Sequence, residues 1–168
     1  MGIALVERLL GGLVPASLRL ARRLQPAGAV AAVVSLLLGE GTLAGVVACG
    51  WLVVCLCATV AGVVVARQTW RRAPERRTLG DLTIAAGLCY LTVGGAWLVI
   101  SRLGLRPFDL STDIVRLTSV HFHYAGFAVP VLAAAGLAGV DWFASRVSLV
   151  TGCLAAVAGP PDSGWDSP

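Results

Sequence analysis

The chain has 168 residues, of which 57% are hydrophobic and 13% are charged, and its mean hydropathy is +0.84. A soluble domain carries about 25% charged residues, so this composition argues against one and predicts an all-α, polytopic transmembrane helical bundle. The net charge of +4 comes from arginines in short clusters beside apolar runs. Such clusters indicate contact with the lipid bilayer and argue against a nucleic-acid partner.

The amino-terminal residues 1–26 mix charges with leucines, so we do not expect a cleaved signal peptide there. We expect them to form a cytoplasmic or interfacial amphipathic arm. A helix from Leu9 to Leu24 lying on the membrane surface and an irregular segment are both compatible with this composition.

Residues 27–159 read as a transmembrane domain that begins with an apolar stretch of about 40 residues. A helix over 27–66 would reach about 60 Å, twice the thickness of the hydrocarbon core. We therefore predict two spans joined by a turn at Gly39-Glu40-Gly41, where glycines permit a tight reversal. The predicted spans lie at about 27–38, 43–66, 82–101 and 114–140.

A fifth apolar segment, 147–159, is too short to cross a bilayer unaided. The polar residues 160–168 follow it and do not resemble the end of a membrane domain. We therefore expect the fifth span to be partial and the chain to be truncated.

Arginine placement predicts the orientation in the cytoplasmic membrane. With a cytoplasmic amino terminus and four spans, ten arginines lie inside and three lie outside. The inside group is Arg8, Arg19, Arg22, Arg23, Arg67, Arg71, Arg72, Arg76, Arg77 and Arg146, and the outside group is Arg102, Arg106 and Arg116. This topology places Glu40 and Asp113 outside, at the end where the fourth span begins.

The five cysteines all lie inside apolar runs, and no pair has Cys-x-x-Cys spacing. We interpret them as small apolar packing residues and expect neither a disulfide framework nor a zinc site. They are Cys49, Cys55, Cys57, Cys89 and Cys153.

Both histidines of the chain lie in the fourth predicted span, within residues 116–130 (RLTSVHFHYAGFAVP). On a helix, His121 and His123 point about 200° apart, so one metal ion cannot bind both. His121 shares its face with Tyr124, whereas His123 shares one with Arg116 and with Gly126. Pro130 lacks an N–H and clashes with the carbonyl of Gly126, so we predict a helix kink there.

Ionisable residues and irregular backbone at membrane depth are costly and mark functional sites. We expect a substrate or proton path for a small molecule or ion, with His123 carrying the activity and His121 making an interhelical hydrogen bond. The candidate residues are His121, His123, Tyr124, Arg116, Asp113 and Glu40. Two alternatives stay open: purely structural histidines, and a redox protein that binds haem or metal through one histidine. The leading hypothesis needs no cofactor and is not enzymatic.

The segment His-Phe-His-Tyr-Ala-Gly-Phe, residues 121–127, resembles the signature of the YndJ-like bacterial membrane proteins. The layout of apolar spans over about 27–140 is compatible with that family. The resemblance implies a longer protein with further spans after this point. It carries no established biochemical activity, although some family members are described as transporter-like.

Overall fold

The computed structural model describes residues 2–10, 14–76 and 78–139, and within them all regular structure is helical. This confirms the predicted all-α membrane fold. The five α-helices are α1 (Gly2–Leu10), α2 (Ala16–Leu37), α3 (Thr42–Arg71), α4 (Leu79–Arg102) and α5 (Thr112–His123). The last of them continues through a π turn, Tyr124–Ala128, as far as Gly139. The predicted fifth segment and polar tail lie outside the described residues.

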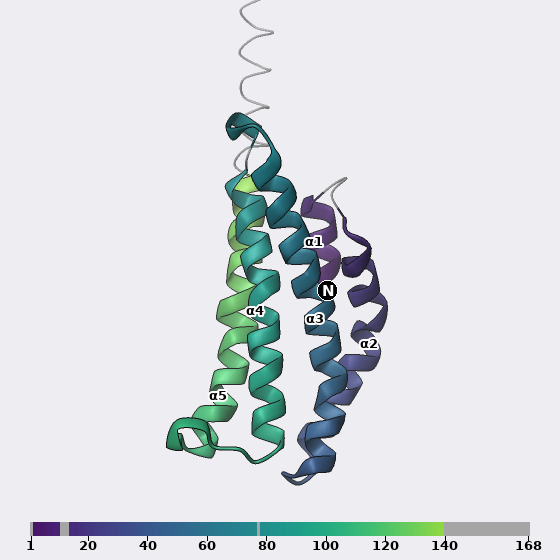
Figure 1. The fold of residues 1–168 in the computed structure, drawn as a ribbon, viewed down its shortest axis with the longest axis vertical. Helices are drawn as coiled ribbons and strands as arrows, with labels where there is room; N and C mark the ends of the chain where they lie inside the picture. The colour runs from purple at the N-terminus through teal and green to yellow at the C-terminus, as the bar shows by residue number, and fades with distance from the viewer. Residues whose placement is uncertain (1, 11–13, 77, 140–168) are drawn as a thin grey trace, which may run out of the picture.

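The four longer helices stand side by side in chain order, and each runs antiparallel to the one before it (Figure 1). Extensive packing joins consecutive helices: α2 with α3, α3 with α4, and α4 with α5. The short α1 packs against α2, where Arg22 Nη1 lies 2.6 Å from Glu7 Oε2. In this row of four helices α2 lies at one edge and α5 at the other, and α1 lies near the last turns of the α5 span.

Three helices are long and apolar enough to cross a membrane: Thr42–Arg71, Leu79–Arg102 and Thr112–Gly139. They correspond to the second, third and fourth predicted spans. The turn that should separate the first two spans is also present, because α2 ends at Leu37 and α3 begins at Thr42.

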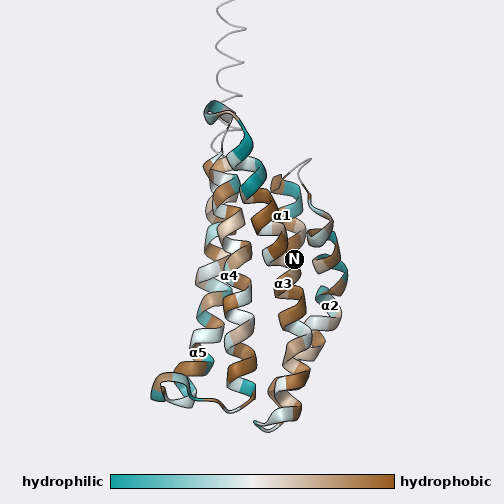
Figure 2. Ribbon diagram, in the orientation of Figure 1, coloured by the Kyte–Doolittle hydropathy of each residue, from teal (hydrophilic) through white to brown (hydrophobic). Residues whose placement is uncertain are grey.

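The first predicted span, 27–38, is not a separate helix as expected. It forms the carboxyl-terminal part of α2, which begins at Ala16 and passes through Pro26 without ending. Figure 2 shows hydrophilic residues at the start of α2 and at the α3–α4 loop, the same end of the bundle. Arg19, Arg22 and Arg23 lie in that first part of α2, which is not among the three apolar helices. Whether α2 crosses the membrane stays a prediction.

Small residues bring α3 and α4 into close contact. A Cβ on Gly62 would lie 2.7 Å from the backbone oxygen of Ala85, so only glycine fits there. Thr59 lies three residues before Gly62 on α3. Its hydroxyl is 2.7 Å from the hydroxyl of Thr92 on α4, and the two share a hydrogen bond. Close backbone approach and interhelical hydrogen bonds are the interactions that hold helices together in lipid.

Candidate functional site

The π turn at Tyr124–Ala128 sets which residues of α5 face its neighbour α4. Buried positions follow one another at helical spacing up to Gly126, and the next buried position, Val131, comes five residues later. A π turn accommodates one extra residue, so both halves of the span present a buried face to α4. The backbone N–H of Val129 bonds to the carbonyl of Tyr124, just before Pro130, which has no N–H to donate.

His123 lies on the inner side of α5 and connects it to α3. Trp51 Nε1 donates a hydrogen bond of 2.7 Å to His123 Nε2, and the two ring centroids are 5.8 Å apart. His123 Nδ1 lies 2.8 Å from the carbonyl oxygen of Ser119. Because an indole N–H can only donate, Nε2 must accept and the ring proton must sit on Nδ1. The geometry therefore assigns a neutral imidazole with both nitrogens engaged.

Gly94 of α4 makes room for the His123 ring. A Cβ at this position would lie 2.6 Å from His123 Nδ1. The carbonyl of Gly94 also accepts a hydrogen bond of 3.1 Å from the buried Ser119 hydroxyl. Two turns away on α4, Gly87 faces Pro130, where a Cβ would approach the proline Cβ to 3.2 Å. Gly94 and Gly87 of α4 thus leave the space in which His123 and Pro130 pack.

His121 and Tyr124 lie on the opposite side of α5, where both are exposed. Within the described chain no hydrogen bond involves either side chain, and His121 has a ring contact only with Phe122, at 5.8 Å. Among the described residues, His123 makes the interhelical hydrogen bond that we expected of His121. The sequence correctly separated the two faces, but it could not tell which face meets the bundle.

The remaining candidates lie at the end of the bundle that carries the α2–α3 turn, apart from His123. Arg116 Nη2 lies 3.3 Å from Glu40 Oε1, joining the start of α5 to the α2–α3 turn. Asp113 is exposed, and the described residues provide no ion pair for it. The structure thus brings Glu40 and Arg116 together and leaves Asp113 outside the pair.

Arg102, the last residue of α4, was predicted only as one of the arginines outside the membrane. It is 3% exposed, and its Nη2 donates a 2.7 Å hydrogen bond to the carbonyl of Leu38. Its own carbonyl accepts a 2.8 Å hydrogen bond from the N–H of Gly41. These two bonds join the α2–α3 turn to the end of α4.

Trp51 and Ser119 are the other residues that the sequence analysis missed. A tryptophan in the middle of an apolar span is a signal, since a buried indole N–H usually finds an acceptor. Ser119 shares a helix face with His123, which the spacing of four residues already indicates. The identity of the acceptor requires the packing of α3 against α5.

Metal or haem binding has little support from these side chains. In the part of the chain that the structure describes, no three His, Cys, Asp or Glu residues lie close enough to hold one metal ion. Both nitrogens of His123 are already hydrogen-bonded. Of the two histidines, only His121 has its ring nitrogens free for such a ligand among the described residues.

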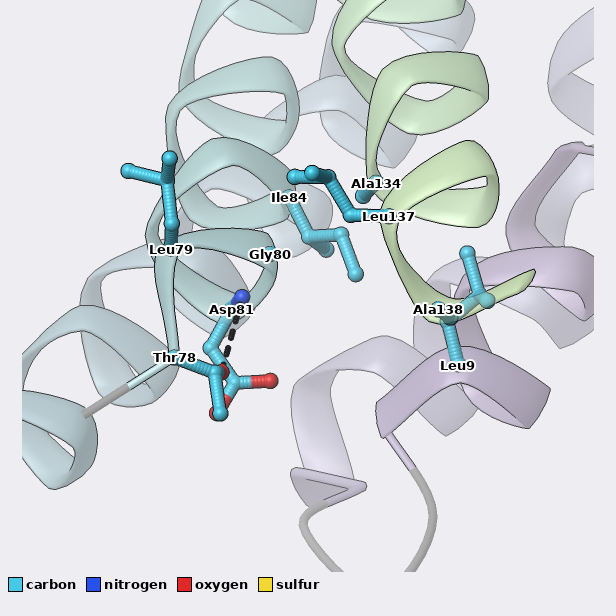
Figure 3. Close-up of a pocket in the computed structure, with 9 residues that line it drawn as sticks. All are labelled: Leu9, Thr78, Leu79, Gly80, Asp81, Ile84, Ala134, Leu137 and Ala138. Carbon is cyan, nitrogen blue, oxygen red and sulfur yellow. Dashed lines mark hydrogen bonds between the residues drawn. The ribbon is translucent and has the colours of Figure 1, made fainter. Parts of the chain in front are cut away.

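A pocket of about 440 Å³ lies at the other end of the bundle, between α1, the start of α4 and the last turns of α5 (Figure 3). Its walls include Leu9, Ile84 and Leu137. Asp81, whose N–H donates to Thr78 Oγ1, is also bonded to Arg72 at 2.8 Å. Asp81, the acidic residue among the described lining of this pocket, is therefore already paired. None of the candidate residues from the sequence is part of that lining.

The described helices are long, apolar and packed antiparallel, and the hydrogen bond between Trp51 and His123 joins two of them. These features define a polytopic integral membrane protein. The comparisons with known proteins are more specific: a model of the YndJ-like protein family matches residues 2–161, so the chain belongs to this family. A Bacillus subtilis (strain 168) relative described as "Uncharacterized membrane protein YndJ" is 35% identical over 51 residues. That stretch is 30% of this chain and 9% of the relative, which is therefore more than three times as long. No solved structure matches the chain.

Proposed function

We propose that this chain is a transporter-like, multi-pass protein of the bacterial cytoplasmic membrane that acts on a small molecule or ion through a site at His123. The observation that carries this proposal is the 2.7 Å hydrogen bond from Trp51 Nε1 to His123 Nε2. It lies within two apolar helices, where ionisable side chains are costly and are kept for function.

The proposed chemistry uses the single acceptor that His123 offers. Since Nδ1 carries the ring proton, Nε2 is the atom that an arriving proton or a substrate N–H or O–H group would contact. Either event displaces the indole of Trp51, because one nitrogen lone pair accepts one donor. Loss of that bond would loosen α3 from α5 and couple binding to a change in helix packing.

The functional prediction concerns the two partners of this hydrogen bond. The host is a strain that lacks the gene, grown under a condition in which it grows worse than wild type. There, His123→Ala and Trp51→Phe should both fail to restore growth. The proteins should still accumulate in the membrane, because one interhelical hydrogen bond contributes only about 0.6–2 kcal/mol. Growth and membrane abundance are measured in parallel.

Trp97→Phe on α4 is the matched control, because the described chain gives the Trp97 ring no hydrogen bond. It should restore growth fully. Full complementation by His123→Ala at normal abundance would remove the site. Loss of function in His121→Ala alone, at normal abundance, would move the site to the exposed face of α5.

The orientation is tested by labelling single cysteines in a cysteine-free chain with a membrane-impermeant maleimide. We expect Gly39→Cys and Arg106→Cys to react in intact cells and Ala73→Cys to react only after permeabilisation. The arginine-rich start of α2 and the α3–α4 loop lie at one end of the bundle, and that end should stay cytoplasmic. Reaction of Ala73→Cys in intact cells would reverse this orientation.

A further inference from the structure

A hollow of about 570 Å³ opens between the last turns of α3 and the start of α4. Figure 2 shows that α3 is hydrophobic along most of its length and becomes hydrophilic at this end, where it reaches the α3–α4 loop. We call this feature the α3–α4 hollow. Its lining residues are Ala66, Arg67, Trp70, Arg71 and Leu82.

The two arginines of the α3–α4 hollow have no counter-charge within the described chain. Both are exposed, and none of the ion pairs or hydrogen bonds between described residues involves either side chain. The neighbouring Arg72 differs, because its Nη1 lies 2.8 Å from Asp81 Oδ2. Arg67 and Arg71 are four residues apart on a helix, so their guanidinium groups lie on one face. Two positive charges beside one hollow favour an anion as its occupant.

The position of the hollow along α3 corresponds to the headgroup level of a bilayer. The residues from Thr42 to Ala66 carry no charge, and a helix of that length crosses a hydrocarbon core of about 30 Å. Arg67 is therefore the first charged residue of α3 at this end. Trp70, which is 64% exposed, is of the type that concentrates at the membrane–water interface.

The face of α3 that carries Arg67 continues toward the membrane interior as an exposed apolar stripe. Val63, Val60 and Leu56 precede Arg67 at alternating spacings of four and three residues, which keep them on one side of the helix. Their exposed fractions are 39%, 54% and 46%. A basic hollow that leads into an apolar stripe matches a molecule with an anionic head and a hydrocarbon tail.

We propose that the α3–α4 hollow binds the headgroup of an anionic phospholipid, whose acyl chain lies along Val63, Val60 and Leu56. The phosphodiester accepts hydrogen bonds from Arg67 and Arg71, since the planar guanidinium group matches the geometry of phosphate oxygens. Basic pockets between membrane helices bind anionic lipid headgroups in this way. The site goes beyond the proposed function, because it includes neither His123 nor Trp51.

Native mass spectrometry of the full chain in detergent micelles tests the proposal. Phosphatidylglycerol should form a one-lipid complex at a lower concentration than phosphatidylethanolamine with the same acyl chains. Arg67→Gln combined with Arg71→Gln should raise the apparent Kd for phosphatidylglycerol about fivefold or more, the effect of one or more basic residues near an anionic lipid. The apparent Kd for phosphatidylethanolamine should not change.

Arg8→Gln combined with Arg106→Gln is the charge-matched control. Both arginines are exposed and lie outside the α3–α4 hollow, so this variant should keep the wild-type affinity for phosphatidylglycerol. Glycerol phosphate, added at the same concentration as the lipid, should not compete because it lacks acyl chains.

Three results would each overturn the proposal. They are equal affinity of the wild type for the two lipids, an equal loss of affinity in the control variant, and full competition by glycerol phosphate, which would indicate a site for soluble anions. The readout is lipid binding, so a failure here is distinct from failure of the site at His123.

Discussion

Replacing Gly62 with alanine should push α3 away from α4 and lower the free energy of unfolding by about 1–3 kcal/mol, the usual cost of overpacking. The added Cβ would lie 2.7 Å from the backbone oxygen of Ala85 and 3.0 Å from the Cβ of Leu88. Neither atom can rotate away, because one belongs to the helix backbone and the other is attached directly to it. The strain must therefore be relieved by separating the helices.

The measurement is SDS-induced unfolding in lipid–detergent micelles, followed by circular dichroism. Gly80→Ala is the matched control: it lies on α4, and a Cβ there meets nothing within 4 Å. Because alanine is the better helix former by about 1 kcal/mol in a helix interior, the control should be neutral or slightly more stable. Equal stability of Gly62→Ala and Gly80→Ala would contradict the close packing of α3 on α4.

Replacing Gly94 with alanine should expel the His123 ring from its position and break its hydrogen bond with Trp51. The new Cβ would lie 2.6 Å from His123 Nδ1 and 2.8 Å from Cε1, so the ring has to move. The variant should lose about 0.6–2 kcal/mol for the interhelical bond in addition to the cost of repacking. The proposed function depends on this hydrogen bond, so Gly94→Ala should lose activity just as Trp51→Phe does.

Nitrogen NMR of histidine-labelled protein reports this change directly. Wild type should show His123 as a neutral ring protonated on Nδ1, with a hydrogen-bonded Nε2. Gly94→Ala and Trp51→Phe should both shift the Nε2 signal of His123 and leave His121 unchanged, which serves as the internal reference. Unchanged His123 signals in both variants would show that the indole does not donate to this ring.

Much of this protein could be predicted from its sequence because the membrane imposes simple rules. Apolar runs of sufficient length identified α3, α4 and α5, since only a helix satisfies its own backbone in lipid. Gly39-Glu40-Gly41 placed the turn between α2 and α3, where the helix length would otherwise exceed the bilayer. The 200° separation of His121 and His123 followed from helical geometry and holds in the structure, where one is exposed and the other faces α3 and α4.

Only the tertiary structure decided whether the His121 face or the His123 face of α5 packs against the other helices. Helical periodicity shows that two side chains diverge, but not which one meets a neighbouring helix, when both sides of the helix are apolar. The choice depends on contacts far apart in the chain: Trp51 with His123, Gly94 beneath the ring, and the π turn that keeps both halves of the span against α4. The same reason explains Arg102, whose hydrogen bond to the carbonyl of Leu38 joins residues 64 positions apart. Composition and periodicity determined the helices, and the matching of small residues to large ones across helices determined the site.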